Sequence, residues 1–461
     1  MRYVVAMGLG LILMIHAAGA QELAVGAAAV KITPPLGIGM AGYYFERGAT
    51  GTNDDLYAKA IVVQCGRQRA ALVGLDLIST TRPMVEAARA EIQKSVGIPA
   101  ENVMISATHA HTGPVLVGRG SREDDQGGEK NIAAEYSAKL PGLVAEAVRL
   151  AASRMQPARA LAAIGREENL SFNRRYFMKD NTVGWNPGKL NPQIVKPAGP
   201  IDPDVGVVLF EQPKAPSTAI ATYVNFAMHP DTTGGQLFSA DYPGVLSRLL
   251  AGYKGQQMVT LFVNGTCGNI NHVDVNWSNR QHGTDEATRI GTILAADVMR
   301  AYRQLAPITT ASLRSRSVMV RLPLPQVTEQ QVEQARQTVR QYGMKDNRGF
   351  MEKVRAYRVL DIAARQGKPF DVEVQAIALG DDLAFVSLPG EIFVELGLAI
   401  RKASPFRYTM IAELANGSIG YIPDRKAYDE GNYEPESARC AAGSGEMLVE
   451  GAGKLLAELK R

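Results

Sequence analysis

Apolar runs and amphipathic stretches alternate along most of the chain. Two apolar runs, at 60–65 and 70–78, are separated by a Gly-Arg-Gln-Arg turn and predict a pair of strands. The stretch 83–97 places its apolar residues on one helical face, begins with proline and ends with glycine, and therefore predicts a helix. The apolar run 102–109 that follows predicts a buried strand.

The same alternation continues to the end of the chain and predicts an α/β fold with a mixed β-sheet core and flanking helices. The stretch 324–370 has the pattern of a helical insertion between strands. No internal repeat or clean domain boundary is visible, so we expect one large domain, or one with a small appended subdomain. The further predicted strands are 219–229, 258–265, 383–390 and 408–416, and the further predicted helices are about 131–153, 283–305, 328–343 (with Thr328 and Gln331 as a capping box) and 445–461.

Residues 1–20 have the pattern of an export signal. Arg2 precedes an apolar core, and Ala18-Gly19-Ala20 forms a small-x-small cleavage site. A membrane anchor is the alternative, but the apolar core is short for a helix that spans a bilayer. We expect a mature chain of residues 21–461, without a transmembrane segment, that is periplasmic or secreted.

Composition excludes several classes of protein. The chain has 461 residues, of which 46% are hydrophobic and 21% charged, as is typical of globular proteins. The net charge of +4 and the absence of a Lys/Arg run argue against a nucleic-acid partner. Cys65, Cys267 and Cys440 form no CxxC pair, so one disulfide in an exported protein would leave one thiol over, and the sequence does not say which.

Candidate chemistry lies where four apolar runs stop at polar, glycine-rich sequence. The run 102–109 ends in His109-Ala-His111, and the run 219–229 ends at His229. His272 follows the run 258–265, and Glu391 follows a Pro-Gly turn after the run 383–390. Ligands of α/β proteins bind where strands end, so we expect these five side chains to meet at one place.

Histidine and carboxylate together are a typical ligand set for zinc. Residues two apart on a strand point to the same side, so His109 and His111 face one site if the strand continues through both. Taken singly, a histidine after a strand is usually a structural hydrogen-bonding residue, and Glu391 is explained as the acidic first residue of a helix. The concentration of such residues at strand ends favours a metal site. His282 has no such signal and is assigned to the surface.

Several of these segments resemble the neutral ceramidase family. The segment THAHTGP (108–114) resembles the family's THTHSGP motif, NFAMHPDTTG (225–234) its second histidine segment, and LPGEIFVELG (388–397) its GE turn before a helix. The resemblance runs in the same order from about residue 24 to 455. It also includes the segments 55–63, 72–79, 238–244 and the tyrosine-bearing stretch 420–438.

The resemblance implies the fold of a neutral-ceramidase-like catalytic domain and one zinc ion as cofactor. The zinc ligands that it implies are His109, His229, Glu391 and Tyr421. It also places His111 beside the metal, and Arg174 and Tyr433 next to the substrate. These three side chains would donate hydrogen bonds to the oxyanion that develops in the reaction.

The chain departs from the family's pattern in two places. The family's nucleophilic serine is replaced by Asn271 and the following proline by His272. An amide side chain has no hydroxyl to activate, so we expect a zinc-activated water to attack, with His272 either a general acid or base or a plain loop hydrogen-bond partner. Cys267 is either a substitute nucleophile or a packed structural thiol. We also expect no immunoglobulin-like domain after the catalytic domain, because the chain ends at Arg461 soon after the tyrosine segment.

The function expected from these observations is an exported zinc-dependent hydrolase that cleaves the amide of an N-acyl sphingosine or another N-acyl substrate. The partner is therefore a small-molecule or lipid substrate. The loop 114–130 is largely polar, and no exposed apolar hairpin or amphipathic anchor for a membrane is evident. Two alternatives follow: the same fold acting on an ester or glycoside of a small polar substrate, such as a carbohydrate or acylated sugar, or a binding protein that retains zinc without turnover.

Overall fold

The computed structural model describes residues 22–461, except 119, 123–124, 215–217 and 310–311. The expected export signal at 1–20 lies outside the described residues. Within the described part of the chain, no helix combines the length and the apolar character needed to cross a bilayer.

Three larger sheets form the centre of the protein, and each repeats one strand plan. In each sheet three successive strands pair antiparallel, and a fourth strand then pairs parallel with the third after a crossover helix. The crossover helices are α1 (Arg82–Val96), α3 (Asp241–Lys254) and α7 (Val394–Ala403). The strands are β1 (Leu23–Lys31), β3 (Tyr57–Cys65), β4 (Gln68–Leu75) and β5 (Val103–Ala107) in the first sheet, β7 (Arg159–Arg166), β12 (Asp204–Glu211), β13 (Ala219–Phe226) and β15 (Val259–Asn264) in the second, and β18 (Leu313–Leu322), β19 (Phe370–Leu379), β20 (Leu383–Ser387) and β22 (Tyr408–Ala412) in the third.

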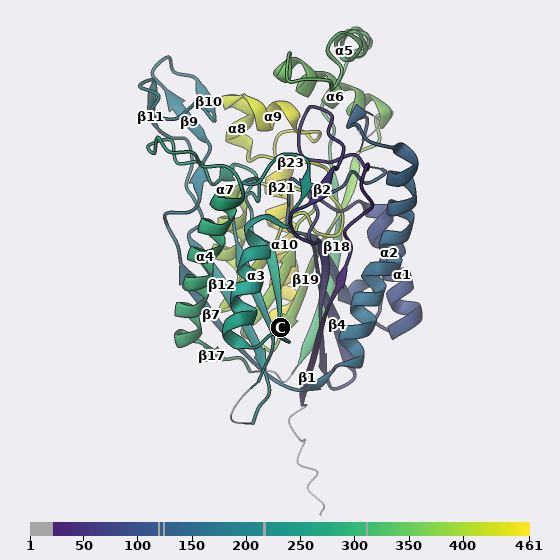
Figure 1. Ribbon diagram of the computed structural model, residues 1–461, viewed down its shortest axis with the longest axis vertical. Helices are drawn as coiled ribbons and strands as arrows, with labels where there is room; N and C mark the ends of the chain where they lie inside the picture. Colours follow the sequence, from purple (N-terminus) through teal and green to yellow (C-terminus); the bar gives the residue numbers. More distant parts are fainter. Residues whose placement is uncertain (1–21, 119, 123–124, 215–217, 310–311) are drawn as a thin grey trace, which may run out of the picture.

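This plan determines where the site lies. Because the third and fourth strands of each sheet are parallel, their carboxyl ends share one edge. The loops that follow β4 and β5, β13 and β15, and β20 and β22 therefore gather at one end of the protein. They lie in the upper half of Figure 1. The threefold plan is a property of the topology, since the sequence itself shows no repeat.

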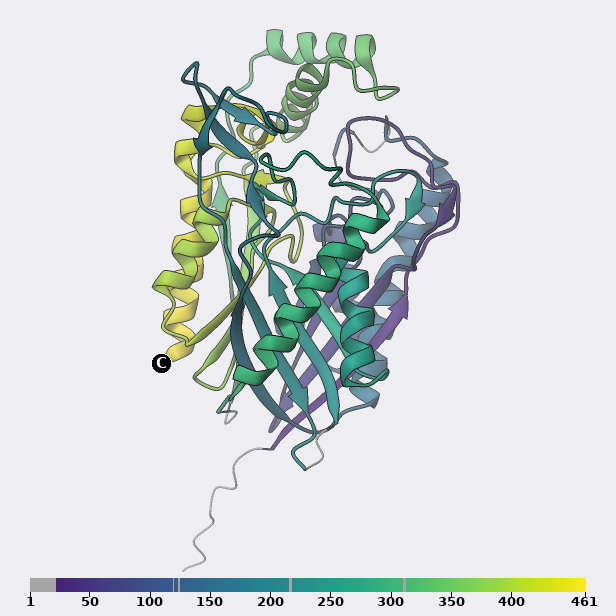
Figure 2. The same ribbon diagram turned by 60° about the vertical axis from the view of Figure 1, so that its left-hand side comes forward.

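The sheets pack against one another on their inner faces and against helices on their outer faces. One apolar cluster joins all three sheets and includes Val63, Phe210, Leu261 and Phe385. Outside them, α1 and α2 (Lys130–Ser153) cover the first sheet, α3 and α4 (Thr284–Ala301) the second, and α7 and α10 (Ser444–Lys460) the third (Figures 1 and 2). Strands covered on both faces are apolar throughout, which explains their continuous apolar runs in the sequence.

The predicted α/β fold and its helical insertion are confirmed. The insertion consists of α5 (Glu329–Tyr342), which begins with the expected capping box, and α6 (Phe350–Ala364). Both lie between β18 and β19 in the chain, at the top of Figures 1 and 2. The shorter elements are β2 (Gly51–Thr52), β6 (Gln156–Pro157), β8 (Phe172–Asn173), β9 (Arg175–Met178), β10 (Val183–Trp185), β11 (Ile194–Pro197), β14 (Leu237–Phe238), β16 (Ile270–Asn271), β17 (Ala306–Pro307), β21 (Glu391–Ile392), β23 (Tyr421–Ile422), α8 (Arg425–Glu430), α9 (Tyr433–Ser437) and the 3-10 turns η1 (Ala100–Asn102) and η3 (Tyr302–Gln304).

Two local predictions are wrong. The strand does not continue through the histidine pair: β5 ends at Ala107, and His109 has a φ of 73° because its N–H bonds to the carbonyl of Leu77 in a neighbouring loop. Glu391 does not open a helix either. It lies in β21, where its N–H donates to the carbonyl of Gly420, and α7 begins at Val394.

Candidate active site

His109 and His111 project from the loop after β5 and converge although they do not lie on a strand. The Nδ1 of His109 lies 2.7 Å from the carbonyl oxygen of Ile78, and its Nε2 lies 3.2 Å from the Nε2 of His111. A carbonyl oxygen only accepts hydrogen bonds, so Nδ1 of His109 carries the proton. Its Nε2 is therefore turned toward the centre of the site.

His229 is held in the same manner from the second sheet. It follows β13, and its Nδ1 lies 2.9 Å from the carbonyl oxygen of Ile270 in β16. The ring centroids of His229 and His109 are 4.5 Å apart, and both side chains are buried. Backbone carbonyls that bind Nδ1 commonly fix histidines whose Nε2 binds a metal.

Glu391 and Tyr421 reach this place from segments that follow β20 and β22 of the third sheet. They are partners in the short parallel pair of β21 and β23. The Oε2 of Glu391 lies 3.4 Å from Nε2 of His109 and 3.5 Å from Nε2 of His229. One carboxylate oxygen therefore faces two imidazole nitrogens in the interior of the protein.

The charges of this group are strongly coupled. Burial alone would raise the pKa of Glu391, but His109 and His229 outweigh it and hold that pKa well below its ordinary value. Burial acts to lower the pKa of His109, but the charge of Glu391 outweighs it and raises that pKa. Burial and the neighbouring Arg174 lower the pKa of His229 to about 3. An ionised carboxylate and a neutral imidazole are the forms in which these side chains bind a cation.

The donor set fits a metal ion. The imidazole nitrogens of His109, His111 and His229 all lie within 4.8 Å of one another, beside the Glu391 carboxylate. Nitrogen and carboxylate donors around a buried point suit zinc. The negative charge of Glu391 raises the pKa of His109 and would also attract a metal cation. A proton and a metal ion therefore compete for Nε2 of His109. In this arrangement both His111 and Glu391 are close enough to bind a metal together with His109 and His229.

Arg174 is aimed at the same centre. Its Nη2 donates to the carbonyl oxygen of Gly268 at 2.7 Å and to the hydroxyl of Tyr421 at 3.0 Å, and its Nη1 lies 3.3 Å from Nε2 of His229. The buried Glu434 accepts from its Nε at 2.8 Å. Burial disfavours the cation, but Tyr421 and Glu434 outweigh it and raise the pKa of Arg174. The guanidinium is therefore a fixed positive charge with one edge directed into the site.

A cavity of about 480 Å³ opens onto this group of side chains. His109 and Glu391 are not part of its lining and lie next to the lining residue His229. The cavity brings together seven of the predicted site residues: His111, Arg174, His229, Asn271, His272, Tyr421 and Tyr433.

Two solved structures with a similar fold are ceramidases. A neutral ceramidase from Pseudomonas aeruginosa superposes with a TM-score of 0.75 and 19% sequence identity, covering 95% of this chain and 75% of that one. This chain has the neutral-ceramidase fold. A second structure, a ceramidase complexed with C2, gives a TM-score of 0.72 at 18% identity, again over 95% of this chain and 75% of the other. No family model matches the sequence, and no curated protein matches it.

The loop that contains Asn271, His272 and Val273 lines the cavity. Asn271 accepts from the N–H of Val273 through Oδ1, and its Nδ2 donates to Oδ1 of Asn186. Nε2 of the buried His272 lies 2.9 Å from the carbonyl oxygen of Gln281. His272 Nδ1 has no hydrogen-bond partner within the described residues. The imidazole is thus fixed at one nitrogen and available at the other.

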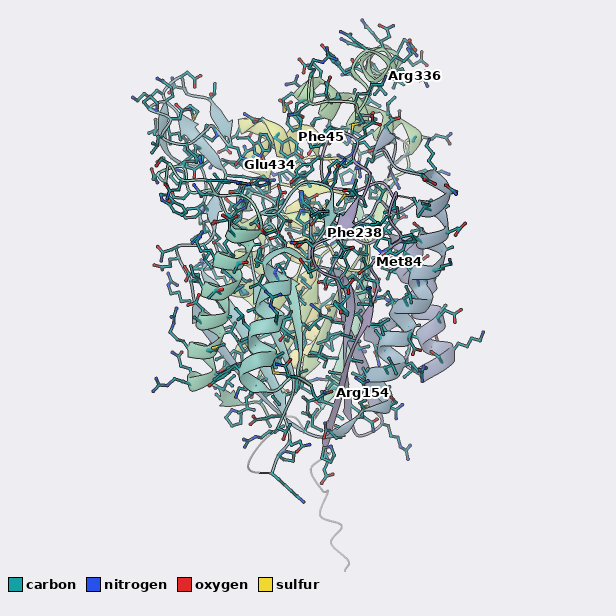
Figure 3. The ribbon with its side chains drawn as sticks, viewed as in Figure 1. Phe45, Met84, Arg154, Phe238, Arg336 and Glu434 are labelled. Atoms are coloured by element: carbon teal, nitrogen blue, oxygen red, sulfur yellow. The ribbon has the colours of Figure 1, made fainter. Side chains whose placement is uncertain are left out.

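Sequence reasoning missed much of the rest of the cavity wall. Trp185 comes from β10, Phe350 from the start of α6, and Asp231 from the loop after His229. Only Asp231 had a signal, since it stands two residues after a predicted ligand. His282 is exposed, as expected, but it also lines the mouth of the cavity. Figure 3 shows Glu434, which binds Arg174, and the lining residue Phe45 in the same upper part of the molecule.

A second buried pair lies next to His229. The thiol of Cys267 donates to Oε1 of Glu413 at 2.9 Å, and its sulfur lies 3.3 Å from Nδ1 of His229. The other oxygen of Glu413 accepts from the N–H groups of Cys267 and Ile392. Cys267 is fully buried and absent from the cavity lining, and burial raises the pKa of its thiol well above the ordinary value. It has the environment of a packed structural thiol. No disulfide is formed within the described residues.

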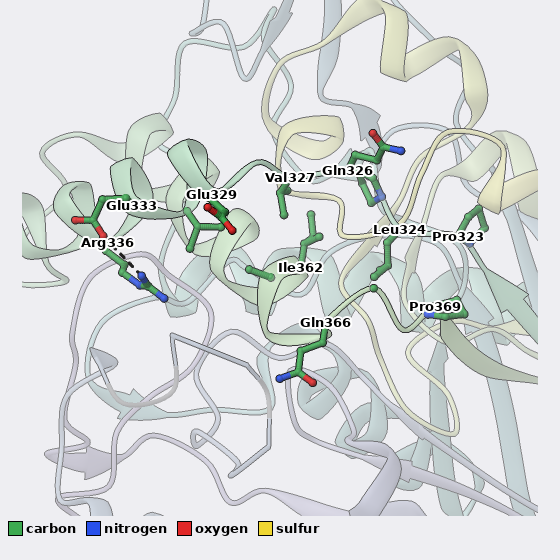
Figure 4. A pocket seen from close by; sticks show the side chains of 14 residues that line it. Pro323, Leu324, Gln326, Val327, Glu329, Glu333, Arg336, Ile362, Gln366 and Pro369 are labelled. Carbon is green, nitrogen blue, oxygen red and sulfur yellow. Dashed lines mark ion pairs between the residues drawn. The ribbon is translucent and has the colours of Figure 1, made fainter.

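A larger cavity lies elsewhere in the protein. A groove of about 1030 Å³ runs between α5, α6 and the segment that follows β18 (Figure 4). Its lining includes Pro323, Leu324 and Ile362, and the ion pair of Glu333 and Arg336 lies at one side. Among the described residues that line it there is no histidine or cysteine, whereas four histidines line the smaller cavity: His111, His229, His272 and His282.

Proposed function

We propose that this protein is a zinc-dependent hydrolase that cleaves an amide bond of an N-acyl substrate. The observation that carries the proposal is the approach of His109 and His229 to one carboxylate oxygen of Glu391, at 3.4 and 3.5 Å, with each Nδ1 bound by a backbone carbonyl. The similarity to the fold of solved ceramidases supports the reaction class.

The residues that would hold zinc are His109, His229, Glu391 and Tyr421. When bound, zinc polarises a carbonyl group and acidifies water. His111 is proposed to stand beside the metal, with its Nδ1 3.5 Å from Oδ1 of Asp231 on the cavity side. Burial and the neighbouring histidines lower the pKa of His111 well below its ordinary value, so it is neutral and donates one hydrogen bond.

The oxyanion that develops on the scissile carbonyl needs donors that are already in place. Arg174 supplies a buried cation whose orientation is fixed by Glu434 and by the carbonyl oxygen of Gly268. Tyr433 lies at the start of α9 with its ring 5.4 Å from that of Tyr421, and burial raises the pKa of its hydroxyl, so the hydroxyl keeps its proton. Preorganised donors of this kind stabilise the transition state more than the ground state.

His272 is proposed to move the proton in place of the family's serine chemistry. Its Nε2 is anchored by the carbonyl oxygen of Gln281, its buried Nδ1 has no partner within the described residues, and the residue lines the cavity together with Asn271. Replacing His272 by Gln should lower kcat between about 100-fold and 10,000-fold, with zinc content unchanged. Wild-type turnover by this variant would reduce His272 to a loop hydrogen-bond partner.

Export to the periplasm or the medium is part of the same proposal. It rests on the pattern of residues 1–20. Expression of the full chain in a bacterial host with an export pathway, followed by N-terminal sequencing of the periplasmic product, should give a chain that begins after Ala20. Recovery of the uncut chain from the cytoplasm would contradict export.

The activity is tested with a fluorogenic N-acyl substrate. We expect cleavage that a chelator abolishes and that added zinc restores, and Glu391→Gln should lower kcat at least 100-fold because the ligand charge is lost. Binding of zinc without cleavage of any amide would contradict the reaction class and leave the metal site standing.

A further inference from the structure

The lining of the reactive cavity differs from that of a lipid channel. Among the described residues that line its approximately 480 Å³, Val273 is the only aliphatic side chain. Small-molecule sites bury the apolar parts of a ligand against matching apolar side chains. A long alkyl chain has no aliphatic wall here, so the composition of the cavity does not suit a lipid with two chains.

One part of the wall is a group of aromatic rings. Trp185 lies on Tyr433 with the ring centroids 4.4 Å apart, and it stacks on Phe350 at 5.6 Å with an interplanar angle of 12°. Phe350 and Tyr433 are 5.4 Å apart, so the three rings fix one another. Such rings offer flat apolar area with polar edges, which suits the C–H face of a sugar ring. Tyr433 also contacts Tyr421, which joins this wall to the proposed metal ligands.

The rest of the lining is mostly polar and keeps hydrogen-bonding capacity. His272 Nδ1 and Trp185 Nε1 are buried and have no hydrogen-bond partner within the described residues. Asp231 accepts from the hydroxyl of Tyr43, and a carboxylate has further acceptor positions. A buried donor or acceptor left unpaired costs about 1–3 kcal/mol, so the Nε1 donor of Trp185 and the Nδ1 acceptor of His272 favour a ligand that brings several hydroxyl groups.

From this lining we infer that the substrate is an N-acylated amino sugar with a short acyl group. The inference rests on the proposed amide hydrolysis at the same site. The sugar ring packs on Trp185 while its hydroxyl groups bind Asp231, and the acyl carbonyl lies toward Arg174 and His272. Hydrolysis breaks the amide C–N bond, water gives its hydroxyl to the acyl carbon and a proton to nitrogen, and the products are the free amino sugar and a short carboxylic acid.

The chain offers a binding probe that needs no turnover. It contains two tryptophans, Trp185 in the cavity and Trp277, which is 36% exposed and outside the lining. In a Trp277→Phe and Glu391→Gln double variant, Trp185 becomes the single emitter and hydrolysis is suppressed. Titration with N-acetylglucosamine should change the Trp185 emission in a saturable way, with a dissociation constant in the millimolar range.

A matched pair of substitutions identifies the polar contact. Adding Asp231→Asn should weaken sugar binding at least tenfold, because a hydroxyl-accepting charge is lost. Adding Asp381→Asn, in the exposed turn between β19 and β20 and absent from the cavity lining, should leave the titration unchanged. Equal titrations with both variants would contradict the assignment of Asp231.

The experiments can contradict the proposed sugar ligand and the proposed amide hydrolysis independently of each other. Sugar binding together with acetate release by the Glu391-containing protein supports both. Sugar binding without acetate release overturns the amide hydrolysis but not the ligand class. No response to the sugar, together with cleavage of a short-chain N-acyl sphingosine, overturns the sugar inference and leaves the hydrolase.

Discussion

Glu391 and Tyr421 are Cα partners in the parallel pair of β21 and β23. Directly opposite residues of paired strands place their side chains on the same side. Two of the four proposed zinc ligands are therefore positioned by one short backbone ladder. The loop after β15 rests on this ladder, because the N–H of Gly268 donates to the carbonyl oxygen of Ile392 at 2.8 Å.

A substitution at Gly268 tests whether the pairing of β21 and β23 positions the proposed zinc ligands. A Cβ at Gly268 would lie 2.6 Å from the carbonyl oxygen of Glu391, so backbone on one side must move. We expect Gly268→Ala to lower the melting temperature and to weaken zinc binding at least tenfold in a chelator competition titration. The control is Gly453→Ala in α10, where a Cβ meets nothing within 4 Å. Wild-type zinc affinity and melting in Gly268→Ala would contradict the tight contact.

Glu413 predicts a pH dependence of stability. Burial raises its pKa from the ordinary 4.5 to about 8, so between these values the folded state holds the proton more tightly than the unfolded state does. The free energy of unfolding should therefore fall as pH rises through this window, by a few kcal/mol at most, and level off above it.

The measurement is urea unfolding with excess chelator at several pH values across that window. Glu413→Gln carries no titrating proton and should flatten the slope. Glu458→Gln, an exposed carboxylate on α10, should keep the wild-type slope. If the slopes of the wild type and Glu413→Gln coincide, Glu413 does not hold a proton in the folded state.

Lys353 connects the helical insertion by hydrogen bonds to a segment that lines the cavity. This fully buried side chain donates from Nζ to the carbonyl oxygen of Tyr44 at 2.9 Å and also to that of Asp346. Tyr44 and Phe350 both line the cavity. Lys353→Met leaves two backbone acceptors unpaired, so we expect a loss of about 1–3 kcal/mol of stability and a KM that rises more than kcat falls.

The control for Lys353 is Lys345→Met, an exposed change in the same insertion. Thermal unfolding and steady-state kinetics on an N-acyl substrate compare the two variants. A Lys353→Met enzyme with unchanged KM and melting temperature would show that the insertion does not shape the substrate site.

The sequence predicts the sheets and helices well, but it predicts the cavity lining only in part. Continuous apolar runs predict strands buried on both faces, and polar residues at their ends predict where His229 and Glu391 gather. The route by which His109 and His111 converge depends on a left-handed φ and a bond to another loop, which no local pattern contains. The strand β21 was missed for the same reason, since its only partner is a distant two-residue strand.

Other residues of the site region were also missed, among them Glu413, which directly follows β22 but lies inside the predicted apolar run 408–416. Trp185, Phe350 and Glu413 enter the site region through the packing of a hairpin, an insertion and a third sheet. Their positions depend on tertiary contacts between segments that are far apart in the chain. The threefold strand plan is hidden for a related reason, because topology repeats here while side chains do not.

The central claim is that His109, His229, Glu391 and Tyr421 hold one zinc ion, with His111 beside it. It is tested by the zinc content of purified wild type, His229→Ala and His111→Ala, measured by mass spectrometry after equilibration with zinc and desalting. The account predicts about one zinc per chain in the wild type and in His111→Ala, and far less in His229→Ala. A wild type without zinc, or a His229→Ala variant that retains it, would contradict the account.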